Sequence, residues 1–399
     1  MLVLMSYVLT ALALVLLVPT LVFFTEVLAG CLLPVRVTEN AGLPHDRRVA
    51  VLIPAHNEGA GIKPTIEDIK PQLRPRDRIV VVADNCSDNT GAVADSLGAE
   101  VSTRNDLTKI GKGYALDWGI KYLAGNPPDV VIVIDADCRV ADAAIENLAK
   151  ECIRSGHPVQ ALDLMTAVAE SPINQQVAEF AWRVKNLVRP LGLHKLNLPC
   201  QLMGTGMAFP WNIIQSAELS NGLVVEDMKL GLEVASQGKS PLFCPAAMVT
   251  STFPTSDAGT KAQRQRWEQG HISLILSEVP ALLRAAIKRR DINILAIALD
   301  LAVPPLSLLI SILTAASIVS ALAAIMGLSV KPFFLVAAGL VLVAAAILLA
   351  WIKHGRDVLP LRSVFLIVPY FARKISLYAT LATGRKVSRW IRTDRSKHT

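Results

Sequence analysis

The sequence predicts an α/β domain folded in water and flanked by membrane-spanning helices. Hydrophobic residues make up 52% of the 399 residues and charged residues only 18%, whereas a soluble protein carries about 25% charged residues. The apolar residues gather toward the two ends of the chain, and the stretch between them alternates short Val/Ile-rich runs with polar turns. This composition excludes both an ordinary cytosolic enzyme and a pure helical membrane bundle.

Residues 1–30 form the first predicted element, a transmembrane helix or signal anchor. Residues 2–30 are almost entirely apolar, with Glu26 as the only charge, and a membrane span needs about 20 residues. The run is too long for the hydrophobic core of a cleaved signal peptide, and it lacks the basic residues that precede such a core.

Residues 36–290 are predicted to fold as the water-soluble domain. Val49–Ile53, Arg78–Val82 and Val130–Ile134 are continuous apolar runs followed by turn residues, which is typical of buried strands. Helical patterns such as Gly113–Leu123 lie between the strands, so successive strands are expected to be parallel.

Two further membrane helices are predicted within residues 292–352. Pro304-Pro305 interrupts the first apolar run, which gives a lead-in segment, a kink and a span over about Leu306–Leu328. The second span covers Phe333–Ile352. The sequence leaves open whether the lead-in segment crosses, re-enters or lies on the membrane.

Positive charge predicts the orientation of the chain. Residues 353–399 comprise an amphipathic segment, Ser363–Thr383, expected to lie in the interface, and a basic tail. Basic residues flank the soluble domain and follow the last span, so the domain and the tail are placed in the cytoplasm at the inner or plasma membrane. The net charge of +7 is therefore assigned to topology, anionic lipid and phosphate rather than to nucleic acid. Six cysteines without a CxxC pair predict neither a zinc site nor a disulfide framework.

Acidic residues follow the predicted strands and open one later helix. These positions are Glu58, Asp84, Asp135, Asp137, Glu226 and Asp227. Open parallel sheets bind ligands beyond the carboxyl ends of their strands, so the six side chains are expected to converge on one crevice. A turn or helix-capping role explains any one of them, but it explains the whole set poorly.

Two short motifs predict phosphate chemistry. Asp135-x-Asp137 turns two carboxylates the same way as the chain leaves a strand, and such hard oxygens bind Mg²⁺ or Mn²⁺ together with substrate phosphates. In Gln263-Arg264-Gln265-Arg266-Trp267, the arginines suit diphosphate oxygens and the indole suits a sugar face. A basic interfacial helix with an anchoring Trp explains this second motif equally well.

The ordered motifs PAHNE, ADNCSDNT, GKGYAL, DAD, GTGMAF, VED and QRQRW resemble those of the membrane-bound family-2 glycosyltransferases, which include cellulose, hyaluronan and poly-N-acetylglucosamine synthases. The resemblance covers roughly Val49 to His271. It implies a Rossmann-like GT-A fold and a metal-dependent, inverting hexosyltransferase that uses a nucleotide sugar, with a UDP-sugar favoured. A single displacement of this kind forms no covalent sugar–enzyme intermediate.

The resemblance also implies roles for individual residues. The implied donor-binding residues are Glu58, Asp84, Lys112, Asp135, Gln263, Arg264 and Arg266. The implied metal ligands, for Mg²⁺ or Mn²⁺, are Asp137 and Asp135. Asp227 resembles the general base, with Glu226 beside it, and the implied acceptor-binding residues are Trp267, Gly204, Thr205 and Gly206.

The acceptor is the open question at this level. About three spans and one interfacial helix are too few to form a polymer channel within one chain. This count favours a lipid-linked or membrane-proximal glycan acceptor in envelope or exopolysaccharide synthesis. The QRQRW motif favours the alternative, a processive synthase that works with polysaccharide-assembly subunits. A non-catalytic membrane protein that binds nucleotide sugars is a third interpretation, and the intact acids argue against it.

Four other polar positions are expected to be structural. Cys86 and Cys138 lie beside motif acids but suit packing better than ligation. His271 is expected to cap or pack. Asp300 lies in the lead-in segment, where a basic neighbour is expected to pair with it.

Overall fold

The computed structural model describes residues 2–34, 42–43, 46–167, 172–220, 225–253 and 257–361, with the side chains of 257–264 left aside. The predicted interfacial segment Ser363–Thr383 and the basic tail lie outside the described residues.

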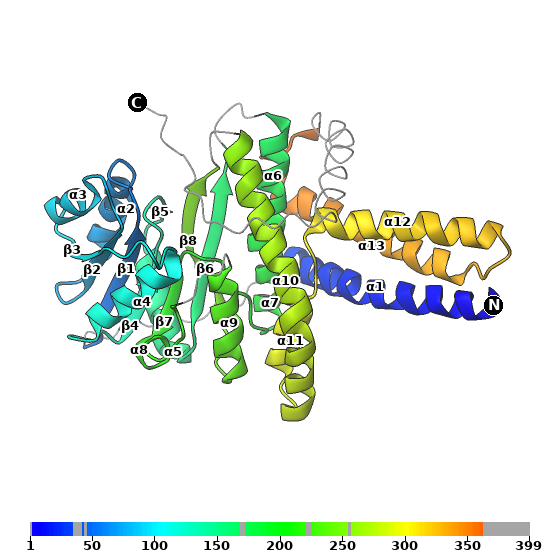
Figure 1. The fold of residues 1–399 in the computed structure, drawn as a ribbon, viewed down its shortest axis with the longest axis horizontal. Coiled ribbons are helices and arrows are strands. Elements are labelled where there is room, and N and C mark those ends of the chain that lie inside the picture. Colours follow the sequence, from blue (N-terminus) through cyan, green and yellow to red (C-terminus); the bar gives the residue numbers. More distant parts are fainter. Residues whose placement is uncertain are drawn as a thin grey trace.

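An eight-stranded sheet forms the centre of the soluble domain, in the order β3-β2-β1-β4-β7-β6-β8-β5 (Figure 1). Its first half consists of β1 Val49–Ala55, β2 Arg78–Asp84, β3 Glu100–Arg104 and β4 Val130–Val133. These four strands are parallel, which confirms the three strands predicted from the sequence and their direction.

The second half of the sheet departs from the expected parallel arrangement. It consists of β5 Arg139–Val140, β6 Val159–Thr166, β7 Met207–Pro210 and β8 Leu242–Thr252. Strand β7 is antiparallel to both β4 and β6, and β5 is antiparallel to β8, so the sheet is mixed. The chain between β6 and β7 packs against α1 as well as against β6 and β8, and it re-enters the sheet antiparallel to β6.

Helices cover both faces of the sheet. They are α2 Ile62–Ile69, α3 Thr90–Ser96, α4 Lys112–Leu123, α5 Ala144–Ser155, α8 Trp211–Ile214 and α9 Glu226–Ser236, with a short 3-10 helix at Lys70–Gln72. Alternate residues of β1 enter two different cores: Val51 packs with α2 and α5, and Leu52 packs with α4 and α9. Burial on both faces explains why the strands are continuous apolar runs instead of alternating ones.

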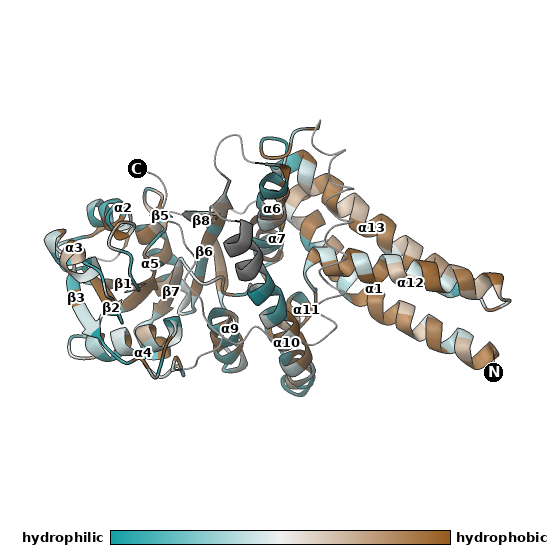
Figure 2. Ribbon diagram, turned by 45° about the horizontal axis from the view of Figure 1, so that its top comes forward, coloured by the Kyte–Doolittle hydropathy of each residue, from teal (hydrophilic) through white to brown (hydrophobic). Residues whose placement is uncertain are grey.

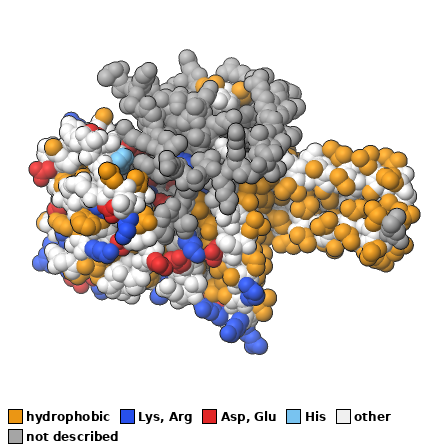
Figure 3. All heavy atoms as spheres, viewed as in Figure 1, with side chains coloured by type: hydrophobic (Ala, Val, Ile, Leu, Met, Phe, Trp, Pro, Cys, Tyr) orange, Lys and Arg blue, Asp and Glu red, His pale blue; other side chains and the backbone are white. Residues whose placement is uncertain are grey.

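Three apolar helices extend side by side away from the domain (Figures 1 and 2). They are α1 Leu2–Leu32, α12 Leu306–Ile325 and α13 Lys331–His354. Apolar side chains cover the exposed surface of this bundle (Figure 3), for example Leu4, Val15 and Val341. Burying such surface in lipid is favourable. The three helices coincide with the segments that the sequence predicts to span a membrane.

Two more helices run across the base of the bundle in Figures 1 and 2: α10 Asp257–Arg289 and α11 Ile292–Leu301. The lead-in segment is thus a short helix that ends before Pro304-Pro305. Four helices are long and apolar enough to cross a membrane, namely α1, α12, α13 and the Gln265–Arg289 part of α10. The Gln265–Arg289 segment lies within residues 36–290, which the sequence assigns to the soluble domain.

A bent helix joins the domain to the bundle. It comprises α6 Ile173–Arg183, a π-helical turn at Val184–Val188 and α7 Arg189–Lys195. Two glycines let α7 approach α1 closely: a Cβ at Gly192 would collide with the carbonyl oxygen of Glu26, and one at Gly30 would collide with that of Val188. The soluble domain is therefore packed directly onto its membrane helix.

Candidate active site

A cavity of about 560 Å³ lies at the carboxyl ends of β1, β2 and β4 and reaches the base of the membrane bundle. Most of the predicted site residues line it. They are Glu58, Asp84, Lys112, Asp135, Asp137, Gly204, Thr205, Glu226, Asp227, Arg266 and Trp267. The convergence expected from the strand ends is therefore present in the structure.

Three predicted positions stand apart from this set. Gly206 does not line the cavity; its φ of +66° and its contacts with Ala161 and Val249 place it inside the sheet, so its lack of a side chain serves packing. Gln263 and Arg264 belong to α10, but their side chains lie outside the described part of the chain.

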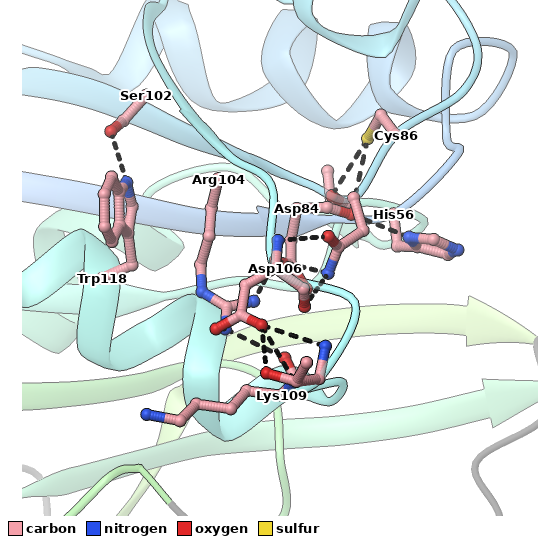
Figure 4. A network of polar contacts seen from close by, with 11 residues as sticks. His56, Asp84, Cys86, Ser102, Arg104, Asp106, Lys109 and Trp118 are labelled. Atoms are coloured by element: carbon pink, nitrogen blue, oxygen red, sulfur yellow. Dashed lines mark hydrogen bonds and ion pairs between the residues drawn. The ribbon is translucent and has the colours of Figure 1, made fainter.

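Asp84, which lines the cavity, belongs to an ion pair that sequence reasoning missed. Asp84, the last residue of β2, accepts a 2.6 Å bond from Nη1 of Arg104, the last residue of β3 (Figure 4). Both side chains are buried, and Arg104 also donates to the carbonyl of Lys109 at 2.9 Å. One charge-assisted bond from Nη1 therefore holds Oδ1 of Asp84, while Nη2 of Arg104 pairs with Asp106 at 3.3 Å.

The turn after β1 is held by its own side chains. Asn57 has a φ of +55°, and its Oδ1 accepts from the backbone N–H of Ser87 at 2.7 Å. The backbone N–H of Glu58 donates to Oγ1 of Thr90 at 2.8 Å. His56 Nδ1 lies 2.7 Å from the carbonyl oxygen of Asp84. These contacts join the β1 and β2 turns and fix Glu58 beside Asp84.

Lys112 contacts both the turn formed by the DAD motif, residues 135–137 (the DAD turn), and the loop before β7. Its ammonium pairs with Oδ1 of Asp135 and donates to the carbonyl oxygen of Gly204 at 2.8 Å. Burial alone would lower the pKa of Lys112, but attraction to Asp135, Glu226 and Asp227 outweighs it and raises the pKa. The side chain therefore remains a cation at the centre of an acidic site.

Asp137 lines the cavity two residues after Asp135, and the Cys138 thiol lies 3.8 Å from its Oδ1. Burial raises the pKa of Cys138, which suits the packing role predicted for it. Among the described residues, no group of three or more His, Cys, Asp or Glu is arranged to hold a metal ion.

Glu226 and Asp227 form the first turn of α9 and face the same space. Burial raises the pKa of both carboxyls, and Glu226 is raised further by its neighbour Asp227. Lys112 and Lys185 act in the opposite direction on Asp227. Acids with raised pKa values in a cleft are typical of proton-transfer sites.

Beside the predicted Trp267, the part of the cavity near the bundle contains four residues that no motif indicated, namely Asp163, Trp182, Lys185 and Asn186. Trp182 and Trp267 are in ring contact, with centroids 5.1 Å apart, and the Lys185 ammonium lies over the Trp182 ring at 5.2 Å. Asp163 is buried, accepts from Asn186 at 3.0 Å, and has a pKa raised to about 7, mainly by burial. Lys185 and Asn186 belong to the π-helical turn Val184–Val188. Such turns often occur at functional sites, but this one is visible only in the structure.

Residues 45–270 match the family model described as "Glycosyltransferase like family 2". The chain belongs to this glycosyltransferase family. The mixed sheet and the family together confirm the predicted GT-A fold.

This glycosyltransferase spans less than two thirds of the length of the curated relatives that it matches. The probable glycosyltransferase YdaM of Bacillus subtilis (strain 168) is 28% identical over 261 residues, which are 61% of this chain and 59% of that protein. The hyaluronan synthase of Streptococcus pyogenes is 30% identical over 119 residues, or 27% of either chain. The mannosyltransferase PcManGT from Pyrobaculum calidifontis, solved with GDP-Man and Mn²⁺, gives a TM-score of 0.48 at 17% identity and covers 85% of this chain and 99% of its own.

The Arg104–Asp84 pair gives a first prediction for the glycosyltransferase. Arg104→Met removes the cation that holds Asp84 and leaves a buried, unpaired carboxylate. We expect nucleotide affinity, measured by calorimetric titration of UDP into the purified full-length protein, to fall about tenfold or more. Arg78→Met is the matched control, because Arg78 pairs with Glu100 at 2.6 Å at the other ends of β2 and β3. Equal losses in the two variants would contradict a specific role for Arg104.

Proposed function

We propose that the protein transfers a hexose, with inversion, from a nucleotide donor to a lipid-linked or membrane-proximal glycan acceptor in envelope or exopolysaccharide synthesis. A UDP-sugar is the preferred donor. The observation that carries the proposal is the shape of the cavity. Acids at its sheet end suit a nucleotide sugar, and Phe23 of α1 and Val303–Ser307 at the head of α12 line its other end. A lipid-linked glycan acceptor could place its polar head near the acidic end and its apolar tail near the end lined by α1 and α12.

In the proposed mechanism, Asp227 removes the proton from the acceptor hydroxyl that attacks the anomeric carbon. Its ionised form is needed for this step, and Lys112 and Lys185 favour that form. Lys112 and Arg266 carry positive charge toward the leaving diphosphate. Trp182 and Trp267 offer apolar faces on which the acceptor sugar would stack.

The DAD carboxylates fit a divalent cation by their chemistry. Asp137 and Asp135 supply hard oxygens from one turn, and substrate phosphates would complete the incomplete ligand set. These two residues would hold Mg²⁺ or Mn²⁺, which stabilises negative charge on the departing diphosphate when bound. Lys112 keeps Asp135 turned toward the loop before β7, which leaves Asp137 as the more direct ligand.

The test is a nucleotide-release screen of the purified full-length protein in lipid nanodiscs across UDP- and GDP-sugars, with membrane extracts as the acceptor source, followed by sizing of the product. Release from one UDP-sugar with a single added residue supports the proposal. A polymer ladder would instead support a processive synthase. Binding of nucleotide sugar without release from any donor would support a non-catalytic role.

The rate of transfer is expected to depend on pH through Asp227. Because burial raises the pKa of this base above the usual aspartate value, kcat/KM should rise as the pH increases through that raised pKa and then level off. Lys185→Met removes a cation that lowers the pKa of Asp227, so its profile should move to higher pH. Lys185→Arg keeps the charge and should keep the wild-type profile. Identical profiles for all three proteins would exclude this electrostatic role.

A further inference from the structure

We propose that a buried polar cluster positions the loop of residues 201–206. The cluster consists of Glu26, Arg189, Asp300 and Gln201. Through Glu26, membrane helix α1 thus contributes to the geometry of the active site. This inference rests on the proposed function, because that loop borders the acceptor side of the cavity. Glu26, Arg189 and Asp300 are at most 8% exposed. Glu26 therefore faces the protein instead of lipid, although α1 is otherwise apolar.

Three helices and the loop meet in this cluster. Nε of Arg189 on α7 donates to Oε2 of Glu26 on α1 at 2.6 Å. Nη2 of Arg189 donates to the carboxylate of Asp300 on α11 and to its backbone oxygen, the latter at 3.1 Å. The other oxygen of Asp300 accepts from Nε2 of Gln201 at 2.6 Å. The basic neighbour expected for Asp300 is thus Arg189, and the pair lies inside the protein.

The same loop is fixed at its other end to Gln160 of β6 and to Asp135 of the DAD motif. Gln160 accepts from the backbone N–H of Met203 and donates to the carbonyl of Thr205, both at 2.8 Å. Oγ1 of Thr205 accepts from the backbone N–H of Asp135 at 3.0 Å. A continuous series of hydrogen bonds and covalent links therefore connects α1 with the DAD turn.

The loop also lies against the proposed base. Gly204 has a φ of +98°, and a Cβ built there would lie 3.3 Å from Oδ2 of Asp227. A small shift of the loop would consequently change the space in which the acceptor hydroxyl meets Asp227. Misplacement of reacting groups by about 1 Å lowers rates by as much as about a hundredfold.

Docking of α1 does not by itself require these charges. Close packing at Gly30 and Gly192 already holds α1 against α7, and Nζ of Lys195 donates to the carbonyl of Gly30 at 2.6 Å. Without the Glu26 carboxylate, Arg189 still pairs with Asp300, so its guanidinium keeps a buried counter-charge. Arg189, Asp300 and Gln201 all line the cavity, which places the cluster at the site and not only between helices.

The key variant is Glu26→Leu in the full-length protein in nanodiscs. It breaks the link to Arg189 while keeping α1 apolar, and we expect transfer to fall about tenfold or more with UDP affinity unchanged. Glu26→Gln should recover most of the activity, because only Oε2 of Glu26 has a partner within the described structure and the amide oxygen can still accept. Lys195→Met, which removes an α1–α7 bond outside the cavity, should stay within about twofold of wild type.

Hydrogen exchange tests the same inference without catalysis. In Glu26→Leu, amides of residues 201–206 should exchange faster, whereas Lys195→Met should leave them protected as in wild type. Gln201→Ala combined with Glu26→Leu should lose no more transfer than either change alone, since both break one series of contacts.

The outcomes separate this inference from the proposed function. A wild-type protein that releases nucleotide from no donor overturns the function, and the exchange experiment still decides the role of the cluster. Unchanged exchange in Glu26→Leu, or a parallel loss of UDP affinity and transfer, overturns the positioning role. Multiplicative losses in the double variant would show that Glu26 and Gln201 act independently and would also overturn it.

Discussion

Asp227→Asn is expected to lower the kcat for sugar transfer about 10²- to 10⁴-fold, the range that a general base contributes. The amide has the shape of the carboxylate but cannot take up the hydroxyl proton at neutral pH. Nucleotide affinity should change little, because Lys112 keeps its contacts with Asp135 and Gly204. Product formation from the best donor, measured alongside UDP titration, gives both quantities on one protein preparation.

Glu233→Gln on the same helix is the matched control for Asp227→Asn. Glu233 pairs with Lys229 at 3.9 Å and does not line the cavity, so its neutralisation should leave transfer near the wild-type rate. Full activity of Asp227→Asn would contradict the proposed role of Asp227 as the general base. Glu226, which faces the same space, would then be the next carboxylate to replace.

The fold was predictable where local pattern and burial agree. β1, β2 and β4 are buried on both faces, so their sequences are unbroken apolar runs that end at a polar turn. The antiparallel β7 carries no such signal, because strand direction depends on where the preceding helices α6 and α7 pack. That packing depends on Gly30 and Gly192, which are distant in sequence.

The site was predictable where a motif keeps its residues close together in the chain. Asp135 with Asp137, and Glu226 with Asp227, are such pairs, and the structure places them around one cavity. Arg104 was missed because its partner Asp84 lies on the neighbouring strand, and only strand order brings them together. Arg189 was missed for the same reason, since its two carboxylate partners come from α1 and α11.

Removal of divalent cations is expected to abolish transfer, and Asp137→Asn is expected to lower kcat about 10²- to 10³-fold at saturating metal, comparable to the loss of a charge-stabilising group. The physical reason is the excess of carboxylates in the cavity. Glu226, Asp227 and the DAD pair repel a diphosphate. Among the described residues that line the cavity, acidic residues outnumber the lysines and arginines, which are Lys112, Lys185, Arg189 and Arg266. A divalent ion at Asp137 would reverse this balance.

Two measurements check the metal prediction. Transfer by the wild-type protein is followed after EDTA treatment and after addition of Mg²⁺ or Mn²⁺, and Mn²⁺ binding is followed by electron paramagnetic resonance with and without UDP. Because two carboxylates are an incomplete ligand set, Mn²⁺ should bind weakly alone and tightly with UDP, and Asp137→Asn should remove this enhancement. Asp142→Asn, an exposed acid beyond the DAD turn and outside the cavity, should retain it. Transfer that survives EDTA would mean that Lys112 and Arg266 suffice to offset the leaving diphosphate.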